Sequence, residues 1–476
     1  MLSVFQTIEL HTLIVAGFTI RLLLRDGMWP ASRMAWFMVI LTVPFIGGVL
    51  YFLFGEIDLG HVAERKHREI FARLTAYARA TIGARHAGIS PQMQPAFAYA
   101  QSINGFVATT GNRIRLMEDA QSARAAVIAD IDGAQQSVHI LYYIWLTDTT
   151  GTKTAQALIR AALRGVKCRV MVDGLGSRAF TRSPLWQEMK AAGVEVAIAL
   201  PISRPVRTLL TSRIDLRNHR KITVIDGSIG YTGSQNCADP EFAVKAKYAP
   251  WVDILLRFEG PVVGQLQLLF ASDWLKERDT ALTEFVLEKK AFAEDITAVA
   301  LGDGPTERFG ASPQMFCTLI ESARRELMIT TPYFVPDQTV IDALCATALR
   351  GVNVTLILPK HNDSWVVAAA SRSYYRRFLE AGGKIQEYRD GLLHTKCMTI
   401  DGKAAFIGSS NMDMRSFDLN YENDVLIEDP KVTRALYARQ LAYLAASDQV
   451  TLQDISDWGL HWRMWQNALA TIGPVL

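Results

Sequence analysis

The sequence predicts an α/β fold of two duplicated α/β/α lobes, preceded by an N-terminal transmembrane helical hairpin. Two observations lead to this prediction: an apolar run near the N-terminus, and an alternation of apolar strands with amphipathic helices that occurs twice along the chain. With 476 residues, the chain is longer than one hydrophobic core usually supports, which favours several packed units.

The N-terminal region is predicted to be a membrane anchor over residues 1–56. Residues 34–54 contain no charged side chain and are long enough for a transmembrane helix. Residues 2–24 are less uniform, because they include Glu9 and Arg21, and we interpret them as a first span or a re-entrant segment. A buried helical hairpin of a soluble protein is the alternative. The charges that flank the two segments leave the orientation in the membrane open.

Two similar halves follow a helical connector predicted at residues 57–104. In each half a helix leads into an apolar strand, and the next helix ends in the same pentapeptide, ALRGV, before another strand. We expect a first lobe over residues 105–290 and a second lobe over residues 291–476. The pentapeptide occupies residues 162–166 and 348–352.

Each half carries the pattern HxKxxxxD. Side chains two positions apart on a strand face the same side, so the His and Lys of each copy should point into one space. The Asp is followed by Gly, which is typical of a turn that ends the strand. The residues of the two copies are His219, Lys221 and Asp226, and His394, Lys396 and Asp401.

A GSxN stretch follows each of these motifs. Its small residues would let backbone amides and an Asn side chain approach an anion closely, which predicts a phosphate-binding role. A strand histidine or a GSxN turn is common by itself, but two matched copies in repeated surroundings favour function. The predicted substrate-binding residues are Ser234, Asn236, Ser409 and Asn411.

The duplicated HxKxxxxD and GSxN motifs resemble those of the phospholipase D superfamily over nearly the whole chain after about residue 100. The apolar N-terminus and the stretches PYFVPD, ADPEF and MRSFDLNYEND are similar to bacterial cardiolipin synthases of the A type. The resemblance implies a multi-pass protein of the bacterial cytoplasmic membrane. It also implies two lobes whose motifs meet at one active site.

The resemblance further implies transfer of a phosphatidyl group from one phosphatidylglycerol to another, giving cardiolipin and glycerol. His219 would form the phosphohistidine intermediate, and His394 would act as the acid and then the base. Lys221 and Lys396, with the two asparagines, would hold the phosphoryl oxygens without a metal or other cofactor. Asp226 and Asp401 complete the catalytic motif as orienting or structural members.

A catalytic imidazole also needs its second nitrogen held, usually by a carboxylate. Asp253 and Glu422 are the candidates, because each lies at the start of an apolar strand in its half. We expect Asp253 to orient His219 and Glu422 to orient His394. An ordinary surface carboxylate is the alternative for each.

Several functional alternatives remain open. Water or another headgroup alcohol could replace the second lipid, which would make the protein a phospholipase D or a different phosphatidyltransferase. A nuclease would use the same motifs, but a net charge of only +3 argues against nucleic acid as a partner. A non-catalytic membrane scaffold ranks last, since both motif copies are intact. The motifs do not predict an oligomeric state.

Two further segments have two readings each. The aromatic-rich residues 458–466 could form an interfacial helix or pack on the second lobe. A basic run could bind anionic headgroups or form a solvated face. It consists of Arg204, Arg207, Arg213, Arg217 and Arg220.

Overall fold

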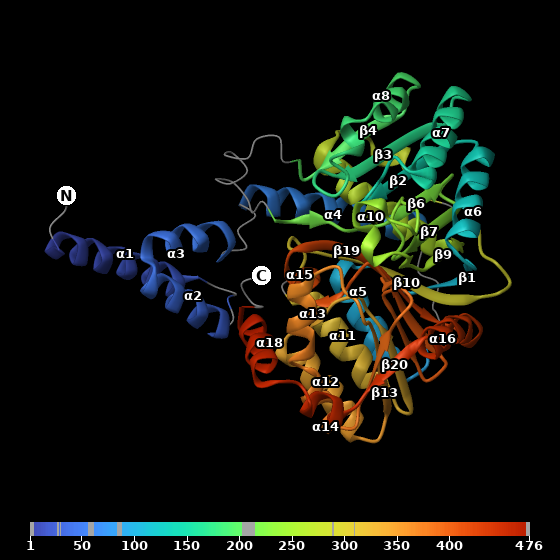
Figure 1. Ribbon diagram of the computed structural model, residues 1–476. Coiled ribbons are helices and arrows are strands. Elements are labelled where there is room, and N and C mark those ends of the chain that lie inside the picture. The colour runs from blue at the N-terminus through green and yellow to red at the C-terminus, as the bar shows by residue number, and fades with distance from the viewer. Residues whose placement is uncertain are drawn as a thin grey trace.

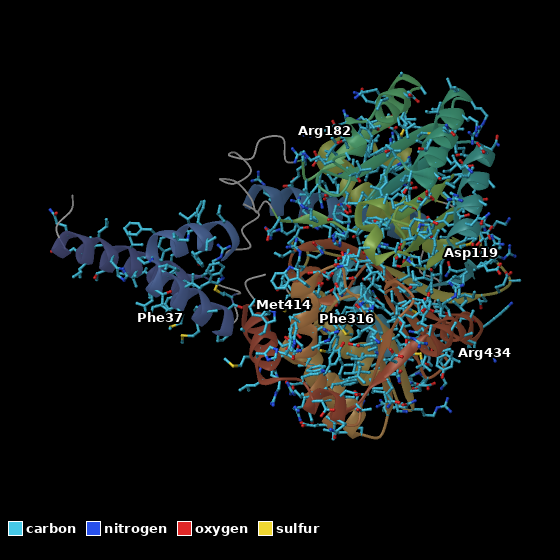
Figure 2. All side chains as sticks on the ribbon, viewed as in Figure 1. Phe37, Asp119, Arg182, Phe316, Met414 and Arg434 are labelled. Carbon is cyan, nitrogen blue, oxygen red and sulfur yellow. The ribbon has the colours of Figure 1, made fainter. Side chains whose placement is uncertain are left out.

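The computed structural model describes residues 4–25, 28, 30–55, 61–82, 88–201, 215–287, 290–308 and 310–472. Two α/β lobes form the body of the molecule, and the helices α1 to α3 project from one side of it (Figure 1). Nearly all side chains of the described chain are drawn in Figure 2, where the body is densely filled and the projecting helices are not.

A single sixteen-stranded sheet runs through both lobes, in the order β20-β14-β13-β11-β16-β17-β19-β10-β1-β9-β7-β6-β2-β3-β4, with β5 paired to β19. The strands of the first lobe are β1 (Thr109–Leu116), β2 (Ser137–Tyr142), β3 (Lys167–Asp173), β4 (Glu195–Ala199), β5 (Arg217–Asn218), β6 (Ile222–Ile225), β7 (Ile229–Gly233), β8 (Trp251–Val252) and β9 (Leu255–Glu259).

The second lobe repeats this order of pairing and adds one strand at the edge. Its strands are β10 (Ile296–Asp303), β11 (Glu326–Thr330), β12 (Phe334–Val335), β13 (Asn353–Pro359), β14 (Lys384–Tyr388), β15 (Leu392–Leu393), β16 (Cys397–Ile400), β17 (Ala404–Gly408), β18 (Met412–Asp413), β19 (Asn420–Glu428) and β20 (Ser447–Val450). The antiparallel pair of β1 and β10 joins the two lobes, so the duplicated halves share one backbone hydrogen-bond network.

Helices cover both lobes. In the first lobe they are α6 (Ala120–Gly133), α7 (Thr149–Leu163), α8 (Pro184–Ala191) and α10 (Pro261–Glu277). In the second they are α11 (Ala311–Ser322), α12 (Gln338–Leu349), α13 (Trp365–Arg372), α14 (Tyr375–Glu380), α15 (Met414–Asp418), α16 (Pro430–Ala445), α17 (Leu452–Ser456) and α18 (Leu460–Ile472).

The repeated pentapeptide ends equivalent helices, α7 and α12. Each helix begins at an aspartate N-cap, Asp148 or Asp337, whose side chain accepts a backbone N–H of the first turn. Each ends just before a glycine with positive φ, +90° at Gly165 and +88° at Gly351, a conformation that favours glycine. The pentapeptide is therefore a helix stop that turns the chain into the next strand.

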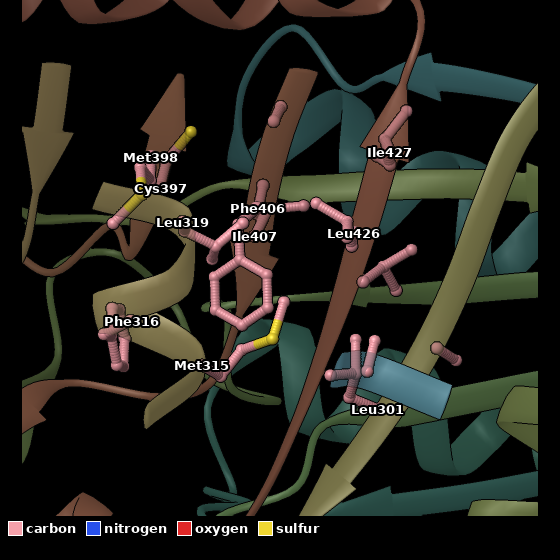
Figure 3. Close-up of a cluster of buried hydrophobic side chains, with 14 of the residues drawn as sticks. Leu301, Met315, Phe316, Leu319, Cys397, Met398, Phe406, Ile407, Leu426 and Ile427 are labelled. Atoms are coloured by element: carbon pink, nitrogen blue, oxygen red, sulfur yellow. The ribbon is translucent and has the colours of Figure 1, made fainter. Parts of the chain in front are cut away.

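The core of the second lobe shows how its layers pack. Phe316 of α11 meets Phe406 of β17 edge to face, with ring centroids 5.7 Å apart (Figure 3). Met315 and Leu319 of the same helix are buried beside them. Such burial contributes about 1.5 to 3 kcal/mol for each large apolar side chain, which holds the helix on the sheet.

The predicted connector, residues 57–104, is divided between the two lobes. Helix α4 (His61–Ile82) packs on α10 of the first lobe. Helix α5 (Gln94–Asn104) packs on α11 and β10 of the second lobe. The second half of the connector is thus part of the body rather than a link to it.

The N-terminal helices differ from the two uninterrupted spans that the sequence predicts. Residues 34–54 are divided among α2 (Pro30–Thr42), α3 (Pro44–Leu50) and a π-helical turn (Tyr51–Gly55). The break falls at Val43, before Pro44, because proline lacks a backbone donor and disfavours helical geometry in the residue before it. Helix α1 (Val4–Leu24) precedes them, and within the described residues no single helix is both long and apolar enough to cross a membrane.

Candidate active site

The histidine of the first motif is positioned by a short parallel strand pair between the lobes. β5 lies beside the start of β19, and the backbone N–H of His219 donates to the carbonyl of Tyr421 over 2.8 Å. The next residue along β19 is Glu422. Its Oε1 lies 3.3 Å from Nδ1 of His219.

The histidine of the second motif is positioned in the same manner. β15 pairs in parallel with β8, and the backbone N–H of His394 donates to the carbonyl of Val252 over 2.9 Å. Asp253 follows Val252 in the sequence. Its Oδ1 lies 2.6 Å from Nδ1 of His394, which makes a direct imidazole–carboxylate contact.

The predicted pairing of histidines with carboxylates is therefore wrong, although both carboxylates do lie at histidines. Each histidine was expected to pair with the carboxylate of its own half. In the structure Glu422 of the second half faces His219, and Asp253 of the first half faces His394. The reason is that the pairs β5–β19 and β8–β15 each join one half to the other.

The serines of the GSxN stretches bind these carboxylates. Ser234 Oγ donates to Asp253 over 2.6 Å, and Ser409 Oγ donates to Glu422 over 2.5 Å. Both serines are fully buried. They hold the carboxylate of their own half in position for the histidine of the other half. Their predicted part in substrate binding stays a prediction.

The two motif lysines make equivalent contacts. Lys221 Nζ donates to the carbonyl of His219 over 2.6 Å, and Lys396 Nζ donates to that of His394 over 2.7 Å. A lysine ammonium has three donors, so each of these contacts leaves donors for a substrate anion.

Each motif lysine lies among charged groups that both halves contribute. Burial lowers the pKa of Lys396 to about 7, with Asp253 opposing this shift and Lys221 adding to it. Burial also lowers the pKa of Lys221, against the attraction of Glu422 and Asp253. Lys221 thus interacts with charged groups from both halves.

Burial acts against the charged form of both imidazoles. Burial lowers the pKa of His219, and Glu422 opposes the shift. Burial lowers the pKa of His394 to about 4, with Asp253 opposing it. The side chain of His219 is 19% exposed and that of His394 9%, so each ring remains open to a ligand on one part of its surface.

The asparagines of the GSxN stretches lie in buried positions. Asn236 Oδ1 accepts the backbone N–H of Ile144 over 3.2 Å. Asn411 Nδ2 donates to Ser416 Oγ over 3.1 Å, while its Oδ1 has no hydrogen-bond partner within the described residues. Their predicted contact with substrate stays a prediction.

The motif aspartates lie at the far end of their strands, away from the imidazoles. Asp226 accepts the backbone N–H groups of residues 135, 136 and 137, at the start of β2. Asp401 accepts those of residues 324, 325 and 326, at the start of β11, and also the side chain of Gln92. Four strand residues separate each aspartate from its lysine, so the two are about 16 Å apart along the chain. Of the two roles expected for these aspartates, orienting or structural, their contacts support the structural one.

The described part of the basic run does not form an exposed surface for lipid headgroups. Arg204, Arg207 and Arg213 lie outside the described residues. Arg217 and Arg220 are buried, and Arg220 pairs with Asp273 over 3.0 Å and donates to the carbonyl of Glu422. Arg220 thus helps to fix the backbone of Glu422 in the active site.

Sequence reasoning did not identify three residues that shape the site. Asn420 Nδ2 lies 3.2 Å from both His219 Nδ1 and Glu422 Oε1. Asn423 Oδ1 accepts the backbone N–H of Lys221 over 2.8 Å. Tyr143 packs on His219 with ring centroids 4.0 Å apart. The period of two along β19, which puts residues 420 and 422 on one face, is the signal that could have revealed Asn420.

Comparisons with known proteins agree with this architecture. A family model described as "Cardiolipin synthase, PLD-like domain" matches residues 127–274 and 316–441, and a phospholipase D-nuclease N-terminal model matches residues 13–56. The crystal structure of phosphatidylserine synthase from Haemophilus influenzae shares the fold with a TM-score of 0.59 and 16% sequence identity, over 80% of this chain and 100% of that one. The fold and the paired motifs define a phospholipase D-like enzyme.

Similar proteins of known function identify the family within this class of enzymes. Cardiolipin synthase A of Proteus mirabilis is 36% identical over 461 residues, covering 94% of this chain and 93% of the relative. Cardiolipin synthase A of Edwardsiella ictaluri is 36% identical over 471 residues, covering 96% and 95%. The chain belongs to the cardiolipin synthase family.

Proposed function

We propose that this protein is a phosphatidyltransferase that joins two phosphatidylglycerol molecules into cardiolipin and releases glycerol. The observation that carries the proposal is the crossed arrangement of two histidines, each backed by a carboxylate from the opposite half. Such an arrangement supplies one nucleophile and one proton carrier to the same phosphorus atom.

In the first step His219 is the nucleophile. Its Nδ1 faces Glu422, which leaves Nε2 to attack the phosphorus of the donor lipid. The bond from phosphorus to the glycerol headgroup breaks, and His394 gives a proton to the departing oxygen. A phosphatidyl group is then bonded to His219, and free glycerol leaves.

In the second step His394 acts as the base. It takes the proton from a headgroup hydroxyl of a second phosphatidylglycerol, and that oxygen attacks the phosphohistidine. The bond from phosphorus to His219 breaks and cardiolipin forms. The proton returned to His394 balances the one it gave in the first step.

The lysines stabilise the charge that develops on the phosphoryl oxygens. Lys221 and Lys396 lie in a buried site, where a charge is screened less than in water. The amides of Asn236 and Asn411 would supplement them. A bound phosphodiester brings negative charge next to these cations and both imidazoles, which raises their pKa values towards the charged forms.

We further propose that residues 1–56 anchor the enzyme in the bacterial cytoplasmic membrane as a multi-pass segment. Helices α1 to α3 leave large apolar side chains open on their surface, which lipid would cover. The fully exposed or half-exposed ones include Leu13, Ile20, Leu23, Leu24, Met34, Ile46 and Val49. Tethering places the site where lipid acceptors are concentrated.

The test is product analysis with phosphatidylglycerol labelled in its acyl chains and headgroup. We expect thin-layer chromatography and mass spectrometry to show labelled cardiolipin and free glycerol. Phosphatidic acid as the main product would assign the protein to hydrolysis instead. Unchanged lipid with correctly folded protein would contradict any transfer activity.

A further inference from the structure

Helix α18 carries large apolar side chains on its outer surface. Leu460 is 72% exposed, Met464 66% and Trp462 54%. The neighbouring helix α13 begins with Trp365, which is 63% exposed. Monomeric soluble proteins rarely gather so many large apolar side chains on one exposed surface. We call these four residues, together with Trp465, the α18 surface.

The inner face of α18 packs on the second lobe. The apolar side chains on its outer surface are therefore not needed to hold the helix in place. Gln466 and Leu469 are buried against the lobe. Trp465 stacks on Trp365, with ring centroids 5.9 Å apart and an angle of 7° between the rings. The helix is therefore fixed on α13, with Leu460 and Met464, one helical turn apart, facing outward. The packing expected for residues 458–466 on the second lobe is therefore observed for one face of α18, and the interfacial role stays a prediction.

The segment that leads into α13 connects the two lobes near the α18 surface. Asp363 lies two residues before Trp365, accepts the hydroxyl of Tyr333 over 2.7 Å and pairs with Lys245 of the first lobe. Helix α13 is therefore held in place from both lobes.

The chemistry of the surface fits lipid better than protein. Tryptophan is the side chain most typical of the boundary between headgroups and acyl chains, and isolated exposed Leu and Met add apolar area that can enter it. Neither α13 nor α18 contains an acidic residue, while Arg463 is exposed beside the apolar side chains. An anionic lipid surface would meet no repelling charge from either helix.

The position of α18 in the molecule agrees with this chemistry. In Figure 1 it occupies the edge of the second lobe on the side from which α1 to α3 project. Helix α15, whose Ser416 donates to Glu422, lies on that same side. One plane of lipid could therefore contact the N-terminal helices and α18 together.

We propose that the α18 surface docks on the bilayer that holds the substrate, as a second contact besides the N-terminal helices, and so brings the site to its lipid. This inference rests on the proposed function for its lipid substrate. The docked surface orients the body, and the N-terminal helices retain it.

The test compares one substrate in two physical forms, using the full chain in nanodiscs. The variant L460D/M464D changes two side chains that are more than 60% exposed, so it removes little packing. The matched control L163D/L349D places the same charges at Leu163 and Leu349, which are 73% and 72% exposed elsewhere on the body. Thermal unfolding of all three proteins confirms equal folding.

We expect L460D/M464D to reduce cardiolipin formation from long-chain phosphatidylglycerol in the nanodisc by at least about 10-fold, because charged side chains resist entry into the interface. Its rate on soluble dihexanoyl phosphatidylglycerol should stay within about twofold of the unsubstituted protein, since the reacting groups are unchanged. The control should keep both rates. Equal losses on both substrates, or no loss on either, would overturn the proposal.

A second readout does not need catalysis. Brominated lipids should quench tryptophan fluorescence of the full chain, and W365F/W462F/W465F should remove the part of this quenching that the α18 surface contributes, leaving the part due to Trp36 of the N-terminal helices. If the protein makes no cardiolipin from either substrate but quenching is present and reduced in this variant, the proposed function fails and docking stands. A detergent-solubilised dimer that L460D/M464D dissociates would assign the surface to a second copy and overturn docking.

Discussion

The two half-sites share a plan but differ at the contact that matters for proton transfer. In each, a GSxN serine holds a carboxylate, and the carboxylate faces the histidine of the other half. Asp253 touches His394 directly at 2.6 Å, whereas Glu422 lies 3.3 Å from His219 and shares that ring with Asn420.

This difference assigns the two histidines to different tasks. A short direct carboxylate contact stabilises the imidazolium form, which suits the residue that carries a proton. A longer contact shared with an amide orients the ring, which suits a nucleophile. Duplication supplied two equivalent histidines, and a few neighbouring side chains separate their roles.

The largest expected effect comes from removing either imidazole. His219→Ala and His394→Ala should each reduce cardiolipin formation by at least about 10⁴-fold, because each step needs both groups. A phosphatidyl ester of p-nitrophenol separates the roles, since its leaving group needs no acid. His394→Ala should release a burst of nitrophenol, and His219→Ala should release none. The reverse result would exchange the two assignments.

Replacing Asp253 and Glu422 tests whether the two half-sites contribute differently to kcat. We expect Asp253→Asn to lower kcat about 10³-fold and Glu422→Gln about 10²-fold, because the direct contact contributes more to the protonated histidine. Steady-state kinetics with both variants, after their thermal unfolding has been compared with the unsubstituted protein, measures this. Equal losses would mean that the two half-sites are equivalent in function.

The lowered pKa of Lys396 predicts that kcat/KM depends on pH. Because the pKa of Lys396 is lowered to about 7, its positive charge is lost as the pH rises through that value, and kcat/KM should fall above it. Lys396→Arg stays charged and should lose the decline centred near pH 7, with a maximum about 10-fold lower because the guanidinium is planar and larger. Profiles from pH 5 to 9 measure both. An unchanged alkaline decline in the variant would exclude Lys396 as its cause.

The smallest catalytic effect is expected at the motif aspartates. Asp226→Asn and Asp401→Asn should keep kcat within about threefold, while the free energy of unfolding falls by about 2 kcal/mol through lost hydrogen bonds to a charged group. Asp401→Asn should be the more destabilising, since Asp401 also binds Gln92. Kinetics and denaturant unfolding measure the two quantities. A large loss of kcat with normal stability would return these aspartates to the catalytic machinery.

Local patterns explain what could be predicted. The His and Lys of each motif share a strand face because side chains alternate with a period of two, and both copies occupy equivalent strands. The helix stops at Gly165 and Gly351 follow from glycine's tolerance of positive φ. Pro44 was a visible reason to doubt one continuous helix over residues 34–54, although membrane helices can tolerate proline.

By itself, the sequence determined the two repeated halves and the two His-Lys pairs, because repeats and strand periodicity are properties of neighbouring positions along the chain. It also indicated the two carboxylates as candidates. Only the tertiary structure decided which carboxylate serves which histidine. That choice is made by the strand pairs β5–β19 and β8–β15, whose partners are far apart in sequence and meet only when the lobes dock. Strand periodicity says which way a side chain points, but docking of the lobes decides what it meets.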